Sequence, residues 1–233
     1  MSASPWAGRL DAAMVDLDGT LVDTLGDFHA ALNRMLAELQ LPAIAASAIE
    51  SMVGKGSEHL IESVLKHALA LDGQAQAAIK IEAIYPAAWD SYQRHYAAIN
   101  GEFSRVYPGV PEGLHSLRSA GLRLACLTNK PQVFAEGLLR TKGLDGFFDH
   151  VFGGDAFARK KPDPLPLLQT CAALGTPPAR TLMLGDSGND AQAARAAGCP
   201  VLLVDYGYNH GQPITSVDAD GYLQHIGDWC QPQ

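Results

Sequence analysis

The sequence predicts an α/β fold, in which a parallel β-sheet carries helices on both faces and a helical segment is inserted after the first strand. Short apolar, partly β-branched runs recur along the chain, and Ala/Leu-rich stretches with helical spacing separate most of them. The runs are almost continuously apolar, as in strands buried on both faces of a sheet. Residues 25–99 show helical spacing throughout and contain no convincing strand.

Each predicted strand follows from one such run. The five runs are AAMVDLD (12–18), LRLACLTN (122–129), HVFGG (150–154), TLMLGD (181–186) and PVLLVDYG (200–207). Helical stretches such as VPEGLHSLRSAG and DAQAARAAG connect them, and Gly121 and Gly198 stand where helix C-caps belong.

The helical residues break the strand–helix alternation and predict a second, smaller domain. We expect residues 1–24 and 100–233 to form the sheet-containing core, with residues 25–99 as an all-helical insertion. Pro108 and Gly109 predict a turn where the chain returns to the core.

Composition limits the function classes. The chain has 233 residues, 47% hydrophobic and 18% charged, which is too apolar for a disordered protein. Its net charge of −8 does not suggest a nucleic-acid partner. No run approaches the length of a membrane span, and the N-terminus has no apolar signal region. The four cysteines lack CxxC spacing, which favours buried thiols, and we expect a cytoplasmic protein with no membrane partner.

Acidic residues follow two of the predicted strands. Asp16 and Asp18 end the first, and Asp186 and Asp190 follow another, four residues apart and expected on one face of a helix. Ligands of open α/β sheets bind beyond the carboxyl ends of the strands, so these acids should meet there. Ionised carboxylates cannot crowd together without a cation, and oxygen ligands without His or Cys suit Mg²⁺.

Phosphate chemistry accounts for the remaining residues at this edge. Thr128 ends another strand, and Lys160 and Lys161 precede a proline-stiffened loop, so a hydroxyl and an ammonium would accompany the metal. Metal, lysine and oxygen donors at one point indicate phosphoryl transfer. Taken singly, each motif also fits a turn, an N-cap or a solvated lysine. An EF-hand is excluded because Leu21 stands where glycine is needed.

The motifs DLDGTLVDT, LTNK, KKPDP and GDSGND, in that order, resemble those of the haloacid dehalogenase superfamily, in its phosphatase branch with a helical cap after the first strand. The phrases YPGVPEGL and DYGYNHG are most similar to the bacterial phosphoglycolate phosphatases. The resemblance spans nearly the whole chain and implies a Rossmann-like core with residues 25–99 as the cap.

The resemblance also implies roles for individual residues. Asp16 would be the nucleophile that forms an aspartyl-phosphate, and Asp18 would protonate the leaving alkoxide and then activate water. The expected Mg²⁺ ligands are Asp16, the backbone carbonyl of Asp18, Asp186 and, in a supporting position, Asp190. The expected phosphate-binding residues are Gly19, Thr128, Asn129 and Lys161. Dehalogenases lack an acid at the position of Asp18, because a halide leaving group needs no proton.

Substrate choice is expected to lie in the helical cap. The loop MVGKGSEHL (52–60) could turn backbone N–H groups inward, and Lys55 could pair with the carboxylate of a small phosphorylated acid such as 2-phosphoglycolate. A flexible turn with a solvated lysine explains the same residues. The sequence leaves open whether the protein is a monomer or a homodimer.

Three other functions stay open at this point. The chain could hydrolyse another small phosphate, such as a sugar phosphate or pyrophosphate. It could transfer phosphate as a β-phosphoglucomutase does. It could also be an inactive binding or regulatory protein, which usually requires the loss of a motif acid.

Overall fold

A six-stranded parallel sheet forms the centre of the molecule. The computed structural model describes residues 8–71 and 77–230. Strand order is β5-β4-β1-β6-β7-β8, with the bounds β1 Ala12–Val15, β4 Arg123–Leu127, β5 His150–Phe152, β6 Thr181–Gly185, β7 Val201–Val204 and β8 Gly221–Leu223. The five predicted strands are all present, each shorter than its apolar run. The edge strand β8 was not predicted from the sequence.

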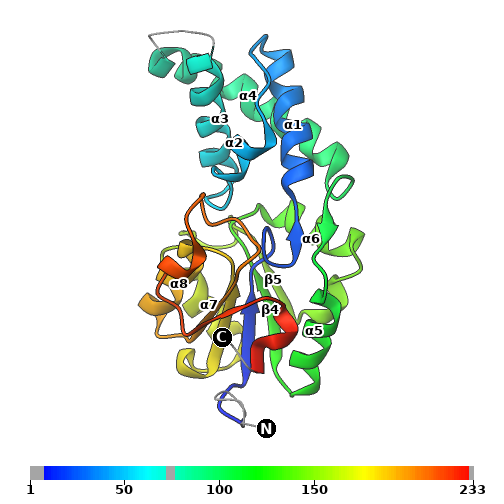
Figure 1. Cartoon of the computed structure of the whole chain (residues 1–233), viewed down its shortest axis with the longest axis vertical. Helices are drawn as coiled ribbons and strands as arrows, with labels where there is room; N and C mark the ends of the chain where they lie inside the picture. Colours follow the sequence, from blue (N-terminus) through cyan, green and yellow to red (C-terminus); the bar gives the residue numbers. More distant parts are fainter. Residues whose placement is uncertain (1–7, 72–76, 231–233) are drawn as a thin grey trace.

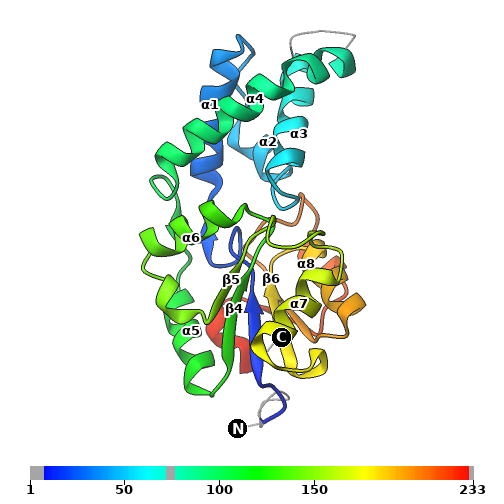
Figure 2. The ribbon, with the colours of Figure 1, turned by 180° about the vertical axis from the view of Figure 1, so that it is seen from behind.

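Helices cover both faces of the sheet, as the apolar strands predicted. Alternate side chains of the strands contribute to two separate hydrophobic clusters. One cluster includes α5 (Val110–Ser119), α6 (Gln132–Thr141) and the 3-10 helix η4 (Ile226–Cys230). The other includes α7 (Leu165–Leu174) and α8 (Gly188–Ala197), which lie side by side in Figure 2. Three further 3-10 turns are η1 Asp145–Phe147, η2 Pro178–Arg180 and η3 Ile214–Ser216.

The helix ends agree with the glycine signals. Gly198 caps α8 with a φ of 77°. The C-cap of α5 is Ala120, and Gly121 follows it with a φ of 86°. Both glycines adopt the left-handed conformation that ends a helix before the next strand.

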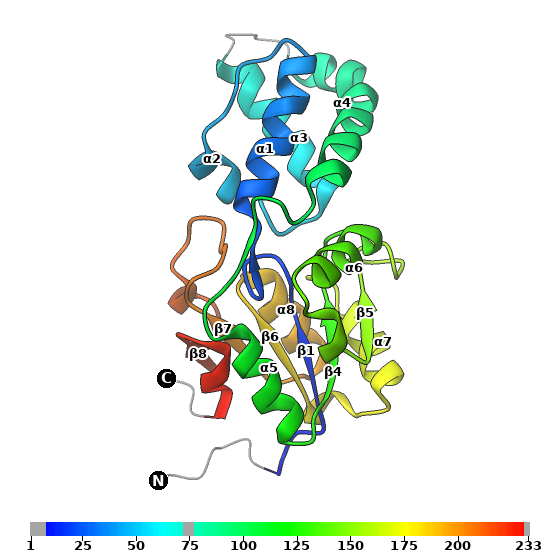
Figure 3. The ribbon, with the colours of Figure 1, turned by 90° about the vertical axis from the view of Figure 1, so that its right-hand side faces the viewer.

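Residues 25–99 are here called the helical segment. Its described parts, 25–71 and 77–99, form four helices: α1 Leu25–Glu38, α2 Ala46–Glu50, α3 Ser57–Leu71 and α4 Ala77–Ile99. They lie beyond the carboxyl ends of the strands, at the end of the molecule away from the start of β1 (Figures 1 and 3). The helices share a hydrophobic cluster that also takes in Phe134 and Tyr208 from the rest of the chain. Whether the segment is a separate domain with the expected boundaries stays a prediction.

Two short connections join the helical segment to the sheet. The chain leaves through β2 (Val22–Asp23) and returns through β3 (Arg105–Val106), which pair antiparallel. This two-stranded sheet was not predicted from the sequence. Pro108 and Gly109 follow β3, and Gly109 is the N-cap of α5.

The buried carboxylate of Asp27 links the two connections by hydrogen bonds. Asp27, in the first turn of α1, is fully buried and accepts hydrogen bonds from the backbone N–H groups of Gly101 (2.8 Å) and Phe103 (2.7 Å). These residues lie between α4 and β3, so Asp27 ties the start of the helical segment to its end.

Two further observations bear on the sequence. The four cysteines, all among the described residues, form no disulfide, and Cys126, Cys171 and Cys199 are buried. Within residues 8–71 and 77–230, no helix is long and apolar enough to cross a membrane.

We predict that Asp27→Ala lowers the free energy of unfolding by about 2–4 kcal/mol, because it leaves two backbone donors without their charged acceptor. Urea denaturation measures the change. The control is Asp90→Ala, at an exposed position of α4, which should stay within about 0.5 kcal/mol of the wild type. Equal stability of the two variants would contradict the role of Asp27.

Candidate active site

Three parallel strands bring their following residues to one edge of the sheet. Val15 of β1 pairs with Cys126 of β4 on one side and Leu184 of β6 on the other. Asp16 follows directly, and its N–H donates to the carbonyl of Leu184 (2.9 Å). Residues after β1, β4 and β6 therefore meet at one level.

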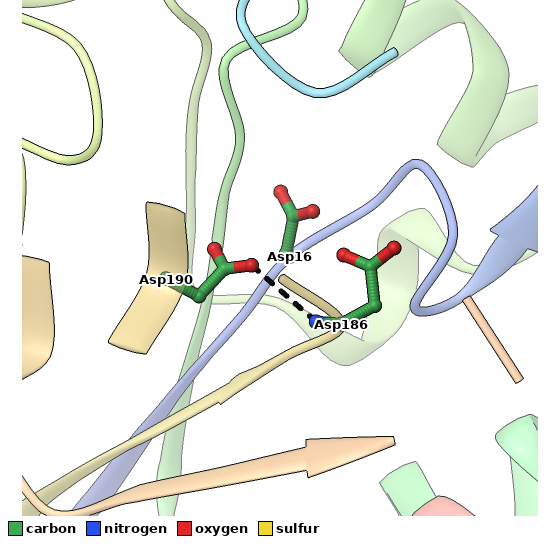
Figure 4. Close-up of side chains that lie close together, drawn as sticks. All are labelled: Asp16, Asp186 and Asp190. Atoms are coloured by element: carbon green, nitrogen blue, oxygen red, sulfur yellow. Dashed lines mark hydrogen bonds between the residues drawn. The ribbon is translucent and has the colours of Figure 1, made fainter. Parts of the chain in front are cut away.

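Three aspartates converge at this edge (Figure 4). Asp16, Asp186 and Asp190 are all buried, and each offers a carboxylate oxygen within 4.8 Å of the others. An all-oxygen set of this size fits a hard cation such as Mg²⁺. The residues present therefore fit the expected metal.

The electrostatics of the cluster favour a cation. Burial is the main cause that raises the pKa of Asp16 to about 6, and the charges of Asp190 and Asp18 add to it. Burial also raises the pKa of Asp186 well above its usual value, with further contributions from the Asp16 and Asp190 charges. A divalent ion would offset this repulsion.

Lys161 is the cation that the chain itself supplies. Its buried ammonium donates to Asp16 Oδ1 (2.8 Å), Asp190 Oδ1 (2.7 Å) and the carbonyl of Leu127 (2.7 Å). The two carboxylates raise the pKa of Lys161 although burial opposes them. The ammonium therefore keeps its charge, and all three of its donors have acceptors.

Asn129 holds Lys161 in place. Its side-chain oxygen accepts the Lys161 N–H (3.0 Å), and its amide nitrogen donates to the Lys161 carbonyl (2.8 Å). The side chain of Asn129 thus has a positioning role, and the phosphate contact expected of its backbone stays a prediction. Thr128 is buried, lines the cavity, and accepts the N–H of Lys130 at its hydroxyl (3.2 Å).

Asp190 is held by the start of α8. Ser187 and Asp190 form a capping box there. Asp190 Oδ2 accepts the Ser187 hydroxyl (2.8 Å) and the N–H groups of Ser187 (3.2 Å) and Asp186 (3.3 Å). The expectation that Asp186 and Asp190 share a helix face was wrong, because Asp186 precedes the N-cap. The two carboxylates still meet.

The carboxylate of Asp186 lies so close to residue 19 that only a glycine fits there. Its Oδ2 accepts the N–H of Tyr208 (2.6 Å). Gly19 has a φ of 84°, and a Cβ there would stand 2.0 Å from Asp186 Oδ2. The predicted phosphate contact of Gly19 is not supported, because its N–H donates to the Val22 carbonyl (2.9 Å). Gly19 instead makes room for the Asp186 carboxylate.

Sequence reasoning missed Lys130. This buried lysine lines the same cavity, and its ammonium contacts Asp18 Oδ1 (3.0 Å) and Oδ2 (3.3 Å). The signal was its place directly after Thr128 and Asn129 at a strand end. Tyr96 of α4 and Tyr208 also line the cavity.

The helical segment also contributes residues to the lining of the cavity. Gly54, Gly56 and Ser57 line it, whereas the Lys55 side chain is exposed and is not among the lining residues. The structure therefore does not support the predicted contact of Lys55 with a substrate. The loop also presents a carbonyl: that of Gly54 accepts the side-chain amide of Asn129 (3.0 Å).

Comparison with known proteins agrees with this arrangement. Residues 10–198 match the family model of the haloacid dehalogenase-like hydrolases. The phosphoglycolate phosphatase of Thiobacillus denitrificans is 41% identical over 219 residues, covering 94% of this chain and 93% of the relative. That of Nitrosospira multiformis is 44% identical over 217 residues, covering 93% and 92%. A crystal structure described as a predicted phosphoglycolate phosphatase from Haemophilus somnus superposes with a TM-score of 0.87 at 30% identity, covering 94% of this chain and 96% of that one.

We predict that the aspartate cluster makes the metal-free protein less stable as pH rises. The folded state holds a proton on Asp16 up to about pH 6, whereas the unfolded chain releases it near 3.8, so the free energy of unfolding falls between these values. Asp16→Asn removes this effect. Its stability relative to the wild type should therefore rise by about 1 kcal/mol between about pH 5 and pH 7.5.

Urea denaturation in the presence of a chelator measures this difference. Mg²⁺ at the higher pH should stabilise the wild type more than the variant, because the variant lacks one ligand. Glu102→Gln, which removes an exposed carboxylate, is the control and should show neither effect. The same pH dependence in the wild type and Asp16→Asn would contradict the prediction.

Proposed function

Since the chain belongs to the haloacid dehalogenase-like hydrolase family, we propose that it is a Mg²⁺-dependent phosphomonoesterase that converts 2-phosphoglycolate and water into glycolate and phosphate. It is an enzyme of the phosphatase class, like its relatives named phosphoglycolate phosphatase. The observation that carries the proposal is that the buried residues Asp16, Asp186 and Lys161 all line one cavity. In this reading the substrate is a small phosphorylated acid. The expected cytoplasmic location stays a prediction.

Asp16 is the proposed nucleophile. Its position at the end of β1, with Lys161 on Oδ1, fixes the carboxylate against the cavity. A carboxylate oxygen attacks phosphorus, the bond from phosphorus to the leaving oxygen breaks, and an aspartyl-phosphate forms. Thr128 binds a phosphate oxygen, and the positive charge of Lys161, held beside Asp16, stabilises the charge that develops on the phosphate.

Asp18 is the proposed proton shuttle. It lines the cavity beside Asp16, where it can protonate the leaving oxygen of glycolate. In the second half it takes a proton from water, which attacks phosphorus and breaks the bond to Asp16. Phosphate leaves, Asp16 is again a carboxylate, and Asp18 again carries the proton that it gives to the leaving oxygen.

Asp16, Asp186 and the backbone carbonyl of Asp18 would hold Mg²⁺, with Asp190 in a supporting position. The hydrogen bonds of both Asp190 oxygens fit that position. When bound, the ion neutralises the carboxylates and stabilises charge on the phosphate oxygens.

We propose that the helical segment acts as a cap over the site. It lies over the carboxyl ends of the strands and supplies Gly54, Ser57 and Tyr96 to the lining of the cavity. Such closure excludes water while the aspartyl-phosphate exists. Movement of the segment would admit the substrate and release the products.

We expect Asp16→Asn to lower turnover of 2-phosphoglycolate by at least about 10³-fold, because an amide is a poor nucleophile. Phosphate release is measured with Mg²⁺ and with a chelator, on 2-phosphoglycolate, pyrophosphate and sugar phosphates. Unchanged far-UV circular dichroism shows that the variant is folded. Full activity in the variant, or activity that a chelator leaves intact, would contradict the mechanism. Transfer of phosphate between sugar hydroxyls would favour a mutase.

A second prediction separates the two roles of Asp18. In Asp18→Asn, turnover of 2-phosphoglycolate should fall by about 10²- to 10⁴-fold, because its alkoxide needs a proton. Release of p-nitrophenolate from p-nitrophenyl phosphate needs no proton donor, so rapid mixing should show a burst equal to the enzyme concentration, followed by slow turnover. Equal losses in the first step on both substrates would argue against proton donation by Asp18.

A further inference from the structure

Lys130 places a buried ammonium in the cavity. Its side chain is 2% exposed. The ammonium contacts both oxygens of Asp18, at 3.0 and 3.3 Å, and the hydroxyl of Tyr96 at 2.5 Å. It also lies 4.7 Å from the ring centroid of Phe28 and 4.6 Å from that of Tyr96. Burial of an ammonium has a large desolvation cost unless anionic groups interact with it.

Few cations face the cavity. Among the described residues that line it, Lys130 and Lys161 are the only lysines, and no arginine takes part. The three donors of Lys161 are already taken by Asp16, Asp190 and the Leu127 carbonyl. Lys130 has one acidic partner where Lys161 has two, so Lys130 is the cation that a second anionic group on the substrate would meet.

The position of Lys130 suits such a group. In the proposed reaction Asp18 contacts the leaving oxygen of the substrate. In 2-phosphoglycolate a single methylene separates that oxygen from the carboxylate carbon. A group that binds the carboxylate must therefore lie next to Asp18, and the Lys130 ammonium lies 3.0 Å from it.

The helical segment fixes the direction of the ammonium. Phe28 of α1 and Tyr96 of α4 place their rings beside it, where the negative face of an aromatic ring attracts a cation. Burial holds the pKa of Tyr96 well above its usual value, so its hydroxyl keeps its proton and can also donate to an anion.

We propose that Lys130 is a specificity-determining residue, which exchanges its contact with Asp18 for the carboxylate of the substrate. The inference rests on the proposed phosphatase function. The exchange has a catalytic consequence, because it releases the Asp18 oxygens toward the leaving group only when a carboxylate is bound. A phosphate ester without a second anionic group leaves Lys130 on Asp18.

The test compares two substrates of similar size, 2-phosphoglycolate and 2-hydroxyethyl phosphate, which has no carboxylate. In Lys130→Met the preference for 2-phosphoglycolate, as the ratio of the two kcat/KM values, should fall about 10- to 100-fold, through a higher KM for 2-phosphoglycolate and a higher kcat for 2-hydroxyethyl phosphate. Lys130→Arg keeps a cation and should retain most of the preference. The control Lys142→Met makes the same change at a partly buried lysine outside the cavity and should leave the ratio unchanged.

Binding without turnover gives a second readout. Calorimetry with Mg²⁺ compares the Kd of 2-phosphoglycolate for Asp16→Asn and for the double variant Asp16→Asn/Lys130→Met, and the Kd should rise by a similar factor. Circular dichroism checks folding, and Lys130→Gln replaces Lys130→Met if the latter does not fold.

The outcomes separate the two proposals. If the wild type prefers 2-phosphoglycolate and Lys130→Met keeps that preference, the inference about Lys130 is overturned and the phosphatase function stands. If the wild type hydrolyses neither ester, the proposed function fails and the inference fails with it.

Discussion

The buried ammonium of Lys161 is the interaction on which the site depends. It joins Asp16 after β1, Asp190 in α8 and the last residue of β4, so three separate parts of the chain meet on one nitrogen. Without it, two buried carboxylates would face each other unpaired, which costs several kcal/mol per ion. The ammonium supplies one positive charge to a group of three acids. A divalent ion would neutralise the remaining negative charge and so allow an anionic phosphate group to bind beside the acids.

Much of the fold follows from local signals. Buried parallel strands are recognisable as continuous apolar runs, because both of their faces are buried. The helical segment is recognisable by the spacing of its apolar residues, because one stripe of each helix is buried. The short strands β2, β3 and β8, with the sequences VD, RV and GYL, lie in no continuous apolar run and so left no such signal. These strands form because the backbone groups of segments that lie side by side in the folded protein pair with each other, which local sequence does not show.

The site was predictable to the extent that residues sit at strand ends. Asp16, Asp186, Asp190, Thr128 and Lys161 are brought together as expected, because the carboxyl ends of parallel strands share one edge. Contacts that depend on the conformation of a loop could not be predicted from the sequence. Gly19 and Lys55 differ from expectation because the direction of a backbone N–H or a long side chain depends on local dihedral angles. The strand-end position of Lys130 did not identify it by itself, since a lysine is usually solvated and the aromatic rings of α1 and α4 come beside this one only in the folded chain.

Asn129 has a consequence for what happens between turnovers. Its oxygen and amide nitrogen hold the backbone of Lys161 on both sides, and the same nitrogen also reaches the Gly54 carbonyl of the helical segment. If that segment swings away, the amide loses Gly54 and keeps both bonds to Lys161. Asn129 therefore contacts both the helical segment and Lys161, and its two bonds to Lys161 do not depend on the position of that segment.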